Sequence, residues 1–72
     1  MDEVVSMIKV VLPAVGTETT YSALYDAVVN NRGNVMLLPA AIRELKREGV
    51  IRQEVGKRQG DTVTQHRIIR IG

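Results

Sequence analysis

The chain has 72 residues, of which 44% are apolar and 25% are charged, and its net charge is +2. This length provides one small domain, residues 1–72, with a thin core, and the apolar content excludes a disordered chain. Cysteine is absent, which excludes disulfides, thiolate metal sites and thiol catalysis, and the single histidine argues against a histidine-based metal site within one chain. We therefore expect neither a metal nor another cofactor.

The two halves of the sequence differ in charge. Residues 1–30 contain one lysine and four acidic residues, a net charge of −3, whereas residues 31–72 contain nine Lys and Arg against four Asp and Glu, a net charge of +5. This asymmetry predicts a basic surface for an anionic partner, nucleic acid above all, although ordinary solvation of a small domain explains it equally well. The first half would then be a scaffold that faces away from the partner.

The first predicted element is a helix. Apolar residues recur at spacings of three and four over residues 4–12, Asp2 is placed to cap the helix, and Pro13 ends it. The polar, β-branched segment 18–20 that follows has the composition of a brief strand. No segment is long and apolar enough to span a bilayer, so we expect no membrane association.

A second helix is predicted from Tyr21 to about Asn30, with Thr20 as its cap. The segment Asn30-Asn31-Arg32-Gly33-Asn34 is the strongest turn signal in the chain. Gly33 or one of the asparagines is expected to take a positive φ there and to stop the helix.

A third helix is predicted from Met36 or Leu38 to Glu48, where Gly49 stops it, with Pro39 in its first turn. At about 100° per residue, its inward face comprises Leu38, Ala41, Ile42 and Leu45. Its outward face comprises Met36, Ala40, Arg43 and Arg47, with Lys46 at the edge.

From Val50 onward the hydrophobic period changes to two, which predicts a hairpin of strands 50–55 and 62–71. A two- or four-residue loop pairs Ile51 with Ile68, whereas a three-residue loop pairs it with Ile69. The two adjacent isoleucines leave both registers open.

This order of helix, short strand, helix, turn, helix and hairpin resembles that of winged helix-turn-helix domains over essentially the whole chain. The residues that carry the resemblance are Thr20-Tyr21-Ser22-Ala23-Leu24 and the run from Ile42 to Ile51, where two apolar positions three apart precede a glycine and an apolar strand start. The resemblance implies an α+β fold, a three-helix bundle with a helix-turn-helix followed by a β-hairpin wing. The turn at residues 31–35 is longer than the shortest in the family, and Pro39 stands where many members have a polar residue.

In members of this family that bind DNA, the third helix usually lies in the major groove and the wing touches the backbone or minor groove. The resemblance implies double-stranded DNA binding by a small transcriptional regulator or accessory protein, with residues 36–48 in the groove and the wing tip 57–61 on the backbone. Such a protein would be cytoplasmic and nucleoid-associated, or nuclear in a eukaryote. The expected DNA-binding residues are Ala40, Arg43, Lys46, Arg47, Lys57, Arg58 and Gln59. Arginine suits both guanine edges and phosphates, and lysine suits phosphates.

Two other functions fit the same sequence. The apolar pair Met36-Leu37 at the start of the third helix, together with Glu44 and Glu48 alongside the arginines, would suit a protein-interaction module. Structured RNA could use the same cations. One module makes few base contacts, so a homodimer or a partner protein is expected, formed through the first helix or a strand edge. Neither an enzyme nor a small-molecule effector is expected, because the glycines are scattered at turns and nothing points to a catalytic triad.

Overall fold

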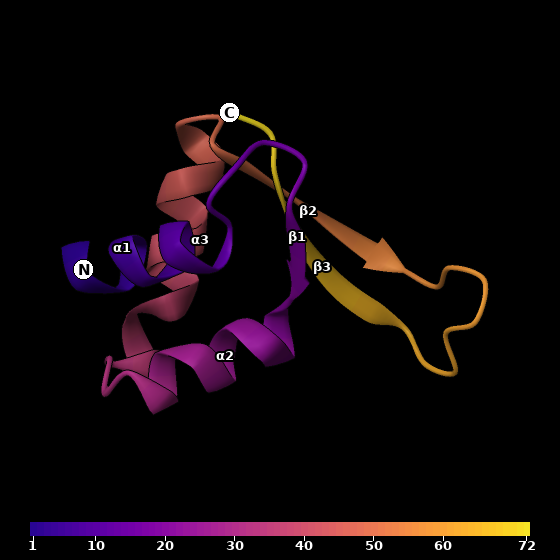
Figure 1. Ribbon diagram of the computed structural model, residues 1–72, viewed down its shortest axis with the longest axis horizontal. Helices are drawn as coiled ribbons and strands as arrows, with labels where there is room; N and C mark the ends of the chain where they lie inside the picture. Colours follow the sequence, from indigo (N-terminus) through magenta and orange to yellow (C-terminus); the bar gives the residue numbers. More distant parts are fainter.

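The computed structural model describes all 72 residues and contains three α-helices and a three-stranded antiparallel sheet. The elements in chain order are α1 (Asp2–Val11), β1 (Glu18–Thr20), α2 (Tyr21–Asn30), the 3-10 turn η1 (Val35–Leu37), α3 (Leu38–Arg47), β2 (Ile51–Gly56) and β3 (Gln65–Arg70). Figure 1 shows the helices gathered at one end of the molecule and the β2–β3 hairpin projecting from the other. The expected α+β class is confirmed, as is the brief strand between the first two helices. None of the helices combines the length and the apolar composition that a bilayer span requires.

The two N-terminal helices begin differently. Met1 occupies the cap position of α1 and no side chain caps the helix, so the prediction that Asp2 is the cap is wrong. Asp2 lies instead in the first turn with Glu3, where negative charge opposes the positive end of the helix dipole. Thr20 does cap α2 as predicted, because its Oγ1 accepts the N–H of Ala23 at 3.1 Å.

The turn after α2 places its strain on an unexpected residue. Arg32 has a φ of +59°, so the prediction that Gly33 or an asparagine takes the positive φ is wrong. Gly33 is required for space: a Cβ there would lie 2.7 Å from Sδ of Met7 and 2.8 Å from Cγ1 of Val28. The sequence pattern located the turn but could not show this close approach of α1.

The third helix starts in two steps. The 3-10 turn η1 comes first, with Oδ1 of Asn34 accepting the N–H of Met36 at 3.0 Å, and α3 follows with Pro39 in its first turn as predicted. The predicted inward face, Leu38, Ala41, Ile42 and Leu45, is buried. The predicted outward residues Met36, Ala40, Arg43 and Arg47 are exposed.

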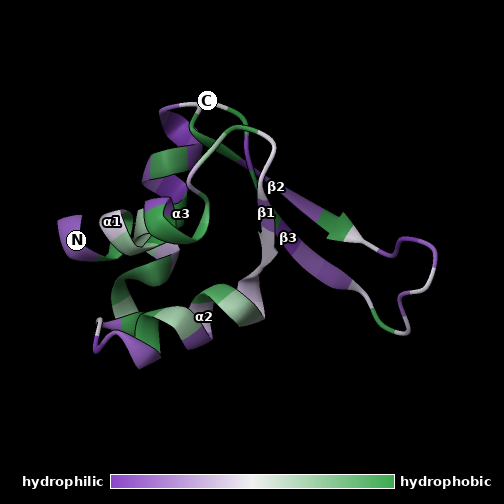
Figure 2. Ribbon diagram, in the orientation of Figure 1, coloured by the Kyte–Doolittle hydropathy of each residue, from purple (hydrophilic) through white to green (hydrophobic).

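The core lies between the helices and one face of the sheet, called here the inner face. Its buried residues are Val4, Ile8, Leu12, Leu24, Val28, Leu38, Ala41, Ile42, Leu45, Ile51 and Ile68. Figure 2 shows that the projecting part of the hairpin is mostly hydrophilic. The apolar core therefore fixes the base of the hairpin and leaves its outer part exposed.

The register of the hairpin differs from both predicted alternatives. The strand order is β1-β3-β2, and β2 pairs Ile51 with Arg70 and Gln53 with Ile68. The connecting loop spans residues 57–64, longer than any loop considered from the sequence. Ile69 is only 7% exposed although it lies on the outer face of the sheet, away from the helices. Two buried isoleucines on opposite faces explain why the apolar pattern did not determine the register.

Candidate nucleic-acid interface

The exposed face of α3 carries all four of its predicted DNA-binding residues. Ala40, Arg43, Lys46 and Arg47 are exposed, while the opposite side of the helix is buried. Arg47 forms an ion pair with Glu44 one turn earlier, although its side chain is 74% exposed. Arg43 has no carboxylate within ion-pair distance. The two arginines on this face are therefore electrostatically different.

The inner face of the hairpin lies beside this helix face. The Nζ of Lys46 is 3.4 Å from Oε1 of Gln53 on β2. Arg43 and Lys46 line a hollow of about 230 Å³ together with Tyr21 of α2 and Gln53. Two cations of α3, Arg43 and Lys46, therefore line the same hollow as Gln53 of the hairpin.

A second hollow extends this surface along the hairpin. It has a volume of about 430 Å³, and Tyr21 and Gln53 line both hollows. We call their combined lining the α3–hairpin surface: Thr20, Tyr21, Ser22, Pro39, Ile42, Arg43, Lys46, Gln53, Thr64, Gln65 and His66. It presents hydroxyls, amides and cations and no carboxylate, so a polyanion could approach it without meeting a like charge.

Sequence reasoning missed the middle of this surface. Gln53 and the segment 64–66 were not expected to contribute, and the segment 20–22 was read only as the start of α2. Their contribution depends on the observed register, which sends alternate residues of β2 toward α3. The available signal was the polar Gln53 between Ile51 and Val55, at the inward position of the two-residue alternation.

The hairpin loop separates the predicted wing-tip residues into two groups. Lys57 and Gln59 are exposed and have no hydrogen-bond or ion-pair partner. Arg58 is engaged: its Nη1 donates to Oε1 of Glu18 at 2.7 Å and its Nε donates to Oε1 of Glu54 at 3.1 Å. Both carboxylates lie on the outer face of the sheet, so the structure does not bring the Arg58 guanidinium to the α3–hairpin surface.

This pairing corrects an expectation about charge. The acidic first half was expected to face away from the basic surface as a scaffold. Glu18 instead neutralises part of the hairpin, and the hydrogen bond from Arg58 holds the pKa of its carboxyl below the ordinary value. The same contact, together with Glu54, raises the pKa of Arg58. The +5 of the second half therefore overstates the charge available to a partner.

A second carboxylate fixes the loop itself. Oδ2 of Asp61 accepts the backbone N–H of Arg58 at 2.8 Å and Nη2 of Arg67 at 2.6 Å. These contacts, the backbone hydrogen bond first, lower the pKa of Asp61. The other terminal nitrogen of the Arg67 guanidinium, Nη1, is buried without a hydrogen-bond partner. The segment 58–61 of the loop is therefore held against the outer face at both ends. Arg58 is held by Glu18 and Glu54, and Asp61 is held by Arg67.

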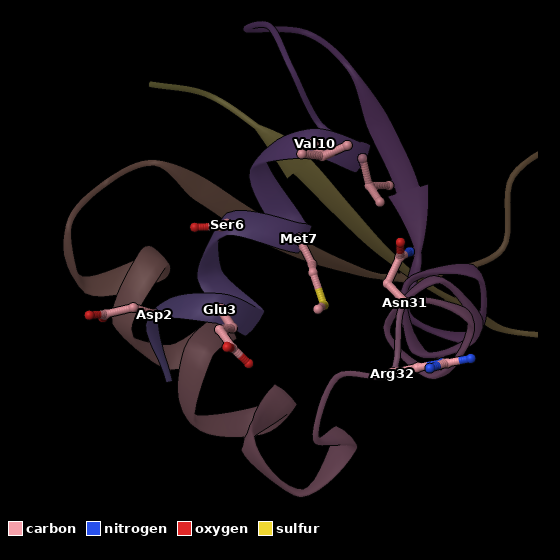
Figure 3. A pocket seen from close by; sticks show the side chains of 8 residues that line it. Asp2, Glu3, Ser6, Met7, Val10, Asn31 and Arg32 are labelled. Atoms are coloured by element: carbon pink, nitrogen blue, oxygen red, sulfur yellow. The ribbon is translucent and has the colours of Figure 1, made fainter.

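A separate hollow of about 690 Å³ lies between α1 and the turn after α2. Its lining comprises Asp2, Glu3, Ser6, Met7, Val10, Val11, Asn31 and Arg32. Figure 3 shows Met7 pointing into this space, whereas Arg32 extends away from α1. With two carboxylates on its α1 side, this hollow is unsuited to phosphate. Nor do three or more His, Asp or Glu side chains gather anywhere as a candidate metal site.

No family model, no curated protein and no solved structure matches this chain. Its function is therefore inferred from the geometry and chemistry of its own residues.

Proposed function

We propose that the chain is a winged helix-turn-helix domain that binds double-stranded DNA, as a small transcriptional regulator or an accessory DNA-binding protein. In this proposal α3 enters the major groove and the β2–β3 hairpin is the wing, touching the backbone or the minor groove. The supporting observation is the α3–hairpin surface, because Arg43 and Lys46 of the helix and Gln53 of the hairpin line one hollow free of carboxylates.

The helix residues have distinct roles in the proposal. The guanidinium of Arg43, with no carboxylate partner, reads a guanine edge or grips a phosphate. Ala40, one turn earlier, allows close approach of the helix to the bases. Lys46 contacts phosphate as a point charge. Arg47 contributes less than Arg43, since Glu44 already neutralises it.

The hairpin residues also differ in their roles. Lys57 and Gln59 contact the sugar–phosphate backbone from the exposed loop. Arg58 remains with Glu18 and Glu54 on the outer face and contributes to affinity only when it leaves them. The hydroxyl of Thr64 and the side-chain amide of Gln65 supply further hydrogen bonds to the backbone of the DNA.

One observation favours a protein-interaction module as the second candidate function. Met36 is 81% exposed at the entry to α3. An exposed methionine adapts to many apolar surfaces, and an apolar partner would cover it. Structured RNA is the third candidate, bound through the same cations without reading of base edges.

The test is a fluorescence titration of duplex DNA at several salt concentrations with three variants. Arg43→Ala should weaken binding to the preferred sequence by about 1–3 kcal/mol, because a base contact is lost. Lys57→Ala should weaken binding to all sequences and lower the slope of log affinity against log salt by about one. Lys9→Ala, which removes an exposed cation from α1, is the control and should have the smallest effect.

Absence of binding at low salt, or equal losses for Arg43→Ala and Lys9→Ala, would contradict the DNA proposal. An RNA duplex bound more tightly than DNA would favour the RNA alternative. Retained DNA affinity in Arg43→Ala together with a protein partner lost on Met36→Ala would favour the protein-interaction module.

A further inference from the structure

The outer edge of β2 is an unpaired strand edge. The sheet order β1-β3-β2 leaves β2 with one neighbour. The N–H of Ile71 donates to the carbonyl of Val50 at 2.9 Å, so by alternation Arg52, Glu54 and Gly56 direct their backbone groups to β3. The backbone groups of residues 51, 53 and 55 therefore point outward. Figure 1 draws no helix or strand along the outer side of the projecting part of β2.

This edge lacks two of the features that prevent edge-to-edge pairing, a proline and a bulge. The six residues Ile51–Gly56 contain no proline, and their register with β3 is continuous, without a bulge. Val55 is 59% exposed on the inner face, beyond the reach of the helical core. A strand of this length with open backbone groups and an uncovered β-branched side chain is suited to pairing with another strand.

The side chains of β2 show which strand fits. Suppose that two copies of β2 pair antiparallel with Gln53 opposite Gln53. The outward-pointing residues 51, 53 and 55 then form the hydrogen-bonded pairs, as their backbone direction requires. In this register Arg52 lies opposite Glu54 of the second copy, and Ile51 lies opposite Val55 of the second copy. The strand is thus complementary to itself in charge and in hydrophobicity.

We propose that the chain forms a two-fold homodimer through antiparallel pairing of β2 with β2 about Gln53. Arg52 and Glu54 lie on the same face of one strand with Nη2 and Oε2 3.7 Å apart, so two copies produce a ring of alternating charges. Their side chains are 57% and 34% exposed and thus accessible to a second copy. Opposite charges directly across an antiparallel pair stabilise it, and like charges there destabilise it.

The arrangement leaves room for the helices. The register offsets the two copies of Ile51 by four residues along the strand, roughly 13 Å. This offset exceeds the roughly 8–10 Å between packed helices, so the α3 helices beside each Ile51 can lie next to one another. The two-fold axis is perpendicular to the sheet, and both α3–hairpin surfaces therefore lie on the same side of the dimer. The proposal does not depend on what those surfaces bind.

The test is sedimentation equilibrium of the whole chain over a concentration series up to about 1 mM, because a short edge buries little area and gives a weak dimer. The wild type should change from monomer to dimer within this range. Arg52→Glu and Glu54→Arg should each raise the dimer Kd at least about tenfold, since each places like charges opposite one another. Lys9→Glu, which makes the same change of charge on α1 as Arg52→Glu makes on β2, should leave the dimer Kd unchanged.

The decisive result comes from mixing the two variants. A chain with glutamate at both positions and a chain with arginine at both positions are complementary across this register. An equimolar mixture of Arg52→Glu and Glu54→Arg should therefore dimerise although each is monomeric alone, with circular dichroism showing that both are folded. A wild type that stays monomeric throughout, or a mixture no more associated than its components, would overturn the proposal.

Discussion

The guanidinium of Arg58 grips the carboxylate of Glu18 with two hydrogen bonds, Nη1 to Oε1 at 2.7 Å and Nη2 to Oε2 at 3.3 Å. The two residues are 40 positions apart in the chain. Their contact joins the hairpin loop to β1 across the outer face of the sheet. Arg58 therefore has a structural role, whereas the neighbouring Lys57 has no carboxylate partner.

Removing the Glu18 carboxylate should loosen the hold on this cation. In Glu18→Gln we expect tighter DNA binding and a salt slope larger by at most about one, because Arg58 is then held by Glu54 alone and is released more easily to a phosphate. The measurement is the same duplex titration at several salt concentrations. Asp26→Asn, an equal change of charge on the exposed side of α2, is the control. Equal gains in both variants would mean that net charge alone acts and that the Glu18–Arg58 pair is irrelevant to binding.

Acidification should weaken the ion pairs of Glu18 and Asp61 that hold the hairpin loop. Glu18 and Asp61 have pKa values lowered from 4.5 and 3.8 by hydrogen bonds from Arg58, and for Asp61 also from Arg67. A lowered folded-state pKa contributes stability above the unfolded value, and this stability is lost as the pH falls through the folded value. The free energy of unfolding should therefore decrease from about pH 5 to about pH 3. Urea unfolding over this range is the measurement.

The acid dependence has an internal control. Glu18→Gln removes one of the two titrating groups, so its free energy of unfolding should fall less steeply with acid than that of the wild type. Asp26→Asn should retain the wild-type slope, because Asp26 is exposed and has no cationic partner. Stability that is constant or rises on acidification would contradict the role given to the two carboxylates.

Substitutions at two neighbouring positions in the turn after α2 should have opposite effects on stability. Gly33→Ala should destabilise the chain by about 1–3 kcal/mol, since its Cβ would meet Met7 and Val28 below van der Waals distance. Arg32→Gly should stabilise it by up to about 1 kcal/mol, because glycine adopts the φ of +59° without a Cβ clash. Urea unfolding of both variants checks the pair, and a stable Gly33→Ala would show that α1 lies farther from the turn.

The core prediction concerns Leu45, which is fully buried on α3. Leu45→Ala should lower the free energy of unfolding by about 2–5 kcal/mol, from lost burial and the cavity left behind. Val63→Ala, in the exposed hairpin loop, should change it by less than about 0.5 kcal/mol. Comparable losses in both variants would contradict the assignment of the core to the helical end.

The helices were predictable because their signals are local. The 3.6-residue period, the Thr20 cap and Pro39 in a first turn each depend on a few neighbouring residues, and they located α2 and α3 to within a few positions. The buried face of α3 followed from the same period. The exposure of Arg43 and Lys46 therefore needed no tertiary information.

The hairpin and its charges were not predictable in the same way. Ile68 and Ile69 are both buried, so apolar alternation did not fix the register, and with it the position of Gln53 beside α3. The pair of Glu18 and Arg58 is a long-range contact without a local signal. Net charge by sequence segment consequently overestimated the cations available on the hairpin.

DNA binding at the α3–hairpin surface is tested most directly by an NMR titration of the ¹⁵N-labelled chain with duplex DNA at low salt. We expect the amide shifts to concentrate on this surface, around Arg43, Lys46, Gln53 and residues 64–66, with α1 unchanged. Shifts centred on α1 and the hollow of Asp2 and Glu3, or no shifts at all, would contradict it.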